Sequence, residues 1–64
     1  ENMFSDDYFI STLKIPSEYV KGFEYYIVDN EQFVRNLKSK NNAMIAFLLA
    51  ELAVKYKEII ASEN

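Results

Sequence analysis

A nearly unbroken apolar segment in the second half of the chain limits the fold more than any other feature. In the range 43–54 every residue except Glu51 is apolar, and neither Gly nor Pro interrupts it. Ala, Leu and Met, which recur there, are among the strongest helix formers. Asn41 or Asn42 can accept a hydrogen bond from the first free N–H groups of such a helix. The sequence therefore predicts one long helix over residues 42–61.

Apolar residues lie on several sides of this expected helix. Ile45, Leu48 and Leu52 recur at steps of three and four residues, which places them on one face. Four further apolar residues lie beside or opposite that face: Met44, Phe47, Leu49 and Val54. In a soluble protein, a helix that is apolar nearly all round is expected to be buried on more than one side.

The length and composition of the chain narrow the class of protein. A single domain of 64 residues buries only about 60% of the surface of its unfolded chain, so a monomer is marginally stable. Cys and His are both absent, which excludes disulfides, zinc fingers and catalysis by thiols or His-based triads. Self-association is the remaining way to stabilise so small a domain, and we therefore expect a homodimer. We expect no enzyme activity, no catalytic or metal-binding residues and no cofactor, since phosphate-binding Gly-rich loops are also missing.

Membrane and export segments are not expected from the sequence. No apolar run approaches the roughly 18 residues of a membrane-spanning helix. The basic, apolar and small-residue regions of a signal peptide are not present in order. We therefore expect a cytoplasmic protein that does not enter a membrane.

The N-terminal part has two interpretations. Ser5 is a good N-cap, and the following Asp6 and Asp7 face the positive end of a helix dipole. These features predict a helix over residues 6–14, which ends before Pro16. Residues 8–15 also suit a β-strand, because Ile, Thr, Tyr and Phe fit a pleated surface. The strand alternative stays open.

The middle of the chain carries the longest periodicity. Val20, Phe23, Ile27, Asn30, Val34 and Leu37 follow at alternating steps of three and four, as in a heptad seam. We expect a helix over 17–38 with a kink or restart at 28–30, and a strand over 23–28 stays open. Asn30 either fixes the register of a pairing seam or caps the restarted helix.

These elements predict an all-α fold, namely a small three-helix domain (1–64) with a helical hairpin that pairs as a homodimeric bundle. The alternative is an α+β fold with a short N-terminal strand. The residues expected to drive self-association are Val20, Phe23, Ile27, Val34, Leu37, Ile45, Leu48 and Leu52.

Charge is distributed unevenly along the chain. Residues 1–34 carry a net charge of −5 and residues 35–64 a net charge of +2. An exposed Tyr among acids suits a protein-binding surface. We expect a non-catalytic interaction or oligomerisation module, acting as a small adaptor, regulator or inhibitor on a protein partner. The expected partner-binding residues are Glu18, Glu24, Tyr25, Tyr26, Asp29 and Glu31.

A second function is suggested by the segment LKIPSEY at residues 13–19, which resembles the strand-to-helix junction of ribbon-helix-helix repressors. The resemblance implies a dimeric DNA-binding transcriptional regulator whose two-stranded ribbon enters the major groove. It implies base contacts from Ile10, Thr12 and Lys14, and phosphate contacts near Lys38 and Lys40. Nucleic acid ranks second to a protein partner, because DNA binding normally depends on a surplus of Lys and Arg and this chain has a net charge of −3.

Overall fold

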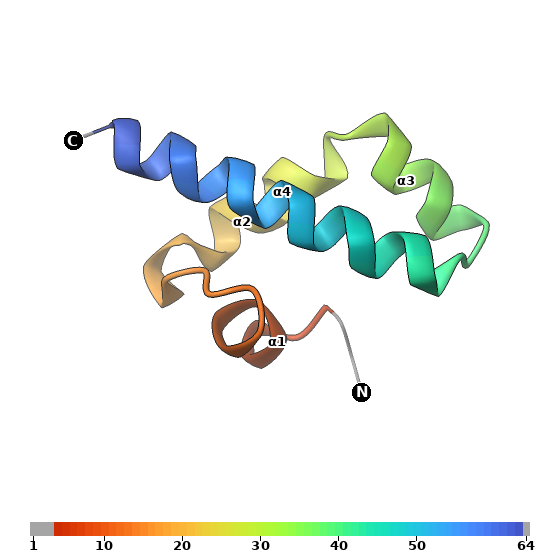
Figure 1. Ribbon diagram of the computed structural model, residues 1–64, viewed down its shortest axis with the longest axis horizontal. Coiled ribbons are helices and arrows are strands. Elements are labelled where there is room, and N and C mark those ends of the chain that lie inside the picture. Colours follow the sequence, from red (N-terminus) through yellow and green to blue (C-terminus); the bar gives the residue numbers. More distant parts are fainter. Residues whose placement is uncertain (1–3, 64) are drawn as a thin grey trace.

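A computed structural model describes residues 4–63, which form four α-helices and one short 3-10 turn. In chain order these are α1 (Asp6–Ser11), η1 (Ser17–Tyr19), α2 (Val20–Val28), α3 (Glu31–Lys38) and α4 (Asn42–Ser62). The long helix α4 runs along the molecule (Figure 1). Helices α2 and α3 pack against it, and α1 packs against α2. The described residues contain no strand, so the all-α class is confirmed.

Three of the helices begin with a side-chain cap. The Ser5 hydroxyl accepts a hydrogen bond from the Tyr8 N–H at 3.1 Å, which caps α1. Asn30 and Asn41 use their amide oxygens in the same way to cap α3 and α4, at 2.8 Å and 3.2 Å. Each cap satisfies a backbone N–H that has no partner inside its own helix. Asn30 therefore caps a restarted helix.

The helix boundaries differ from those expected in two places. The first helix ends at Ser11 instead of residue 14, because Lys14 adopts a left-handed backbone with φ 63° and turns the chain. The helix expected over 17–38 is divided into η1, α2 and α3. The restart expected at 28–30 is confirmed, and the break follows from the extended backbone of Asn30.

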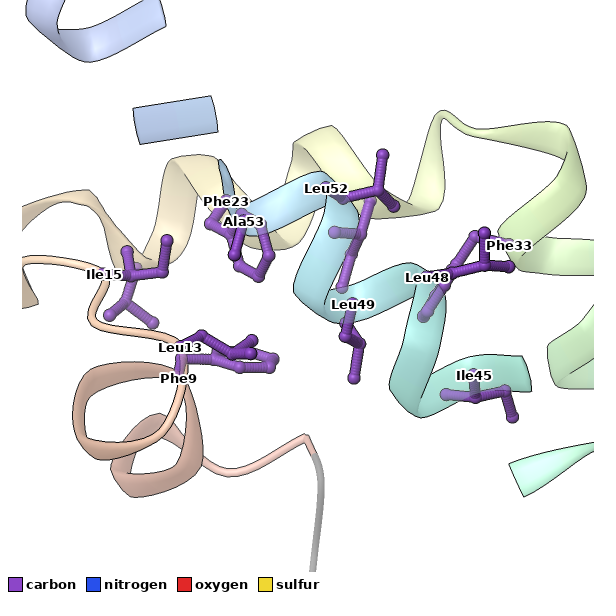
Figure 2. Packing of buried hydrophobic residues seen from close by; sticks show 12 residues of the cluster. Phe9, Leu13, Ile15, Phe23, Phe33, Ile45, Leu48, Leu49, Leu52 and Ala53 are labelled. Carbon is purple, nitrogen blue, oxygen red and sulfur yellow. The ribbon is translucent and has the colours of Figure 1, made fainter. Parts of the chain in front are cut away.

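Each short helix buries one phenylalanine in the core that includes the inner face of α4. Phe9 of α1, Phe23 of α2 and Phe33 of α3 are 1%, 0% and 1% exposed. Figure 2 shows these rings around the inward side chains of α4. The other buried core residues are Leu13, Ile15, Val20, Ile27, Ile45, Leu48, Leu49, Leu52 and Ala53. Burial of one such side chain stabilises a fold by about 1.5–3 kcal/mol.

A hydrogen bond between distant parts of the chain supports this packing. The Lys57 ammonium group on α4 donates to the Leu13 carbonyl oxygen at 3.0 Å. That carbonyl lies in the turn after α1, between two buried side chains at Leu13 and Ile15. The bond joins residues 44 positions apart and fixes the α1 turn against α4.

The end of α3 has the hydrogen bonds of a Schellman motif without the usual glycine. The Asn41 N–H donates to the Asn36 carbonyl and the Lys40 N–H to the Leu37 carbonyl, both at 3.2 Å. Lys40 occupies the left-handed position of the motif with φ 60°. This position usually holds Gly, because a Cβ atom makes the left-handed conformation unfavourable.

We predict that Lys40→Gly raises the free energy of unfolding by about 1 kcal/mol, because it removes the left-handed strain. Chemical denaturation followed by circular dichroism measures the change. Ser39→Gly is the matched control, since Ser39 has an ordinary helical φ of −82° and should lose stability. Equal destabilisation by both substitutions would contradict the assignment of strain to Lys40.

Candidate protein-binding surface

The outer side of α2 exposes two neighbouring apolar side chains. Val20, Phe23 and Ile27 turn the other side of α2 into the core. Tyr25 therefore points away from the core and is 70% exposed, more than any other large hydrophobic side chain in residues 4–63. Val28 follows three residues later, so it lies next to Tyr25 on the helix, and it is 57% exposed.

Acidic residues precede and follow Tyr25 and Val28 in the sequence. Glu18 in η1, Asp29 at the end of α2 and Glu31 at the start of α3 are exposed, and Glu24 is half-buried. Lys21, one turn before Tyr25, is the single basic residue in the range 18–31. We call Tyr25, Val28 and the four acids Glu18, Glu24, Asp29 and Glu31 the α2 surface. It combines an apolar centre with a net negative charge.

Tyr26 is placed differently from Tyr25. Its ring is half-buried and lies 5.2 Å from the Tyr56 ring of α4, measured between centroids. Tyr56 in turn lies 5.5 Å from Phe23. Tyr26 thus helps to fix α2 on α4, and Tyr25 is the more exposed of the two adjacent tyrosines.

Gly22 leaves space for this aromatic contact. A Cβ atom added at Gly22 would meet the Tyr56 hydroxyl group, while the ring carbon that carries the hydroxyl would remain at 3.5 Å. The close approach of α2 and α4 at this point therefore depends on the missing side chain of Gly22.

The Tyr56 hydroxyl group at this contact has a raised pKa. Burial is the main cause of the higher pKa, and the nearby Glu63 and Tyr19 raise it further.

We predict that Gly22→Ala is not stabilising in the natural chain, although Ala is favoured over Gly in a helix by about 1 kcal/mol. In a Tyr56→Phe background the hydroxyl is absent, and Gly22→Ala should then raise the free energy of unfolding by about that amount. Chemical denaturation of the four proteins in this double-mutant cycle measures the coupling. An equal effect of Gly22→Ala in both backgrounds would contradict the contact.

The residues expected to drive self-association lie mainly inside one chain. Those buried in its own core are Val20, Phe23, Ile27, Ile45, Leu48 and Leu52. Val34 is half-buried, and Leu37 is 37% exposed. The heptad seam of the sequence is therefore used to pack α2 and α3 against α4. Of these eight residues, only Leu37 is exposed at the surface of the single chain.

The residues connected with DNA binding lie at the C-terminal ends of two different helices, α1 and α3. Ile10 is on α1, and Thr12 and Lys14 are exposed residues directly after this helix. Lys38 and Lys40 are exposed at the end of α3. Residues 8–11, which the ribbon interpretation assigns to a strand, are helical.

One exposed surface was not expected from the sequence. The periodicity predicted burial of the long helix on more than one side, but α4 is buried on one side only. Phe47 and Val54 on its other side are 61% and 55% exposed. The sequence does show apolar residues on all sides of this helix. That pattern alone could not show which of them are buried and which form an exposed surface.

Residues 4–63 contain no pocket and no group of three acidic residues placed to bind a metal ion. Within the same residues, no helix has the combination of length and apolar character needed to cross a bilayer. Comparisons with known proteins give no matching family model, no similar curated protein and no similar solved structure.

Proposed function

We propose that this chain is a non-catalytic protein-interaction module that binds a basic protein partner through the α2 surface. The observation that supports it best is the exposure of Tyr25, at 70%, directly beside Val28, at 57%. We also propose the homodimer that is expected from the sequence, and it does not depend on the α2 surface.

A tyrosine in this position suits protein recognition. Its ring offers a large contact area with only two side-chain torsions to fix, and its hydroxyl can donate or accept a hydrogen bond at the edge of an interface. Tyrosine is also enriched among the residues that contribute most to binding energy. Val28 extends the apolar centre, so that a partner could bury both side chains in one depression.

The scaffold beneath Tyr25 is well fixed. Phe23 lies 5.3 Å from Phe9 of α1 and 5.5 Å from Tyr56 of α4, measured between ring centroids. These contacts fix α2 from its inner side while Tyr25 remains free on the outer side. A surface on a fixed helix loses little conformational entropy when a partner binds.

The charges indicate the chemistry of the partner. Four acids and a single lysine in the range 18–31 give a negative potential around the apolar pair. A partner with Lys or Arg around an apolar depression would be attracted at long range, and its association rate would fall as salt screens the charges. An adaptor, a regulator or an inhibitor would use such a surface in the same way.

We predict that a photo-crosslinking amino acid at position 25 captures one basic protein from an extract of the source cells. The same amino acid at Lys55, an exposed position on α4, is the control. The captured protein is then purified and its affinity is measured by isothermal titration calorimetry, at a concentration where the chain is monomeric.

Tyr25→Ala should weaken this binding at least about 30-fold, which corresponds to about 2 kcal/mol for a residue at the centre of an interface. Phe47→Ala is the matched control, because Phe47 is another exposed aromatic residue and lies on a different helix. Equal capture at positions 25 and 55, or equal affinity of Tyr25→Ala and the natural chain, would contradict the proposal.

A further inference from the structure

The outer face of α4 is an apolar stripe that nothing in residues 4–63 covers. Ala43, Phe47, Ala50 and Val54 are all exposed, and they follow at steps of four, three and four. This spacing places them in one line along the helix. The opposite face carries the buried Ile45, Leu48, Leu49, Leu52 and Ala53. We call the four exposed residues the α4 stripe.

We propose that a second copy of this chain packs its own α4 stripe against this one, with the two helices antiparallel. The inference concerns a different surface from the α2 surface, so either can fail without the other. The interacting residues are those of the α4 stripe, with Glu51 and Glu58 at its edge.

The stripe is complementary to itself in the antiparallel orientation. A two-fold axis between residues 50 and 51 brings Phe47 of each copy opposite Val54 of the other. Ala50 lies close to the axis, where a small side chain lets two helices approach each other. Phe47 and Val54 of the two copies would thus bury each other, while the small Ala50 lets the helices approach near the axis.

The charges favour the antiparallel over the parallel orientation. Around the same axis, Glu58 of one copy lies opposite Ala43 of the other, at the positive end of the α4 dipole and close to Lys40. A parallel pair would instead place each Glu58 beside its own equivalent and align the two dipoles. One unfavourable contact remains in the antiparallel pair, because Glu51 of both copies lies near the axis.

The small size of the chain also favours a second copy. Sixty-four residues without disulfides make a marginally stable monomer, and α4 already carries the apolar surface that association would bury. Association through α4 would leave the α2 surface, which is on a different helix, available to a partner.

Sedimentation of the full chain from micromolar to millimolar concentration tests the proposal. We expect a reversible monomer–dimer equilibrium. Val54→Glu should raise the dimer dissociation constant more than tenfold, because the interface would then bury an unpaired charge beside Glu51 and Glu58. Val28→Glu is the matched control, because Val28 is 57% exposed and Val54 is 55% exposed, but Val28 lies on α2. This variant should leave the dimer dissociation constant unchanged.

Glu51→Gln gives a result that is specific to a pair of identical chains. It removes the repulsion between the two copies and should tighten the dimer about twofold to fivefold. Circular dichroism checks that all three variants keep their helical content.

Spin labels report the orientation directly. The chain has no Cys, so Ser62→Cys provides a single attachment point at the end of α4. Eleven to twelve residues separate this position from the axis, so the two labels should lie about 35 Å apart in the antiparallel pair. In a parallel pair they would lie about 10 Å apart, the distance between packed helix axes.

A mass that remains monomeric at millimolar concentration would overturn the proposal, and the stripe would then be a surface for a different protein. A dimer that is insensitive to Val54→Glu would also overturn it, as would the short distance between the labels.

Discussion

The burial of three phenylalanines in one core on one side of α4 is the interaction on which the rest of the structure depends. Helices of six, nine and eight residues are too short to be stable in water on their own. Each of them buries one nearly unexposed ring, from Phe9, Phe23 or Phe33, in the shared core. The Phe9 ring contacts Phe23 of α2, so α1 is held in the core through α2. Since each burial contributes about 1.5–3 kcal/mol, the loss of one ring would remove a large part of the stability of a domain of this size.

This arrangement also determines which surfaces remain for binding. The short helices cover α4 on one side, and each of them turns its own inner face toward that side. The outer face of α2 then exposes Tyr25 and Val28, and the outer face of α4 exposes Phe47 and Val54. The proposed partner site and the proposed self-association site therefore both follow from the fact that the core is built on one side of α4.

Local chemistry in the sequence predicts much of the fold. The caps at Ser5 and Asn41, the long helix and the restart near residue 30 depend on short-range hydrogen bonds and helix propensity, which neighbouring residues determine. The early end of α1 could not be predicted in this way. It depends on the left-handed Lys14 between two buried residues, Leu13 and Ile15, and on the distant Lys57.

The candidate surfaces were predictable to different degrees. An exposed tyrosine in an acidic segment was expected, and the helical spacing from Phe23 explains why Tyr25 is exposed. The periodicity of the seam could not show whether its residues pack within one chain or between two chains, because both arrangements bury the same stripe. The free side of α4 is likewise a property of the tertiary structure, since only the number and position of the other helices leave it uncovered.

Solvent exposure of the phenylalanine rings tests the one-sided core most directly. We would record the ring-proton NMR signals with a soluble paramagnetic probe, at a dilution where light scattering gives the monomer mass. The structure predicts strong broadening for Phe47 and protection for Phe9, Phe23 and Phe33. Protection of Phe47 in the monomer, or broadening of any of the other three rings, would contradict a core built on one side of α4.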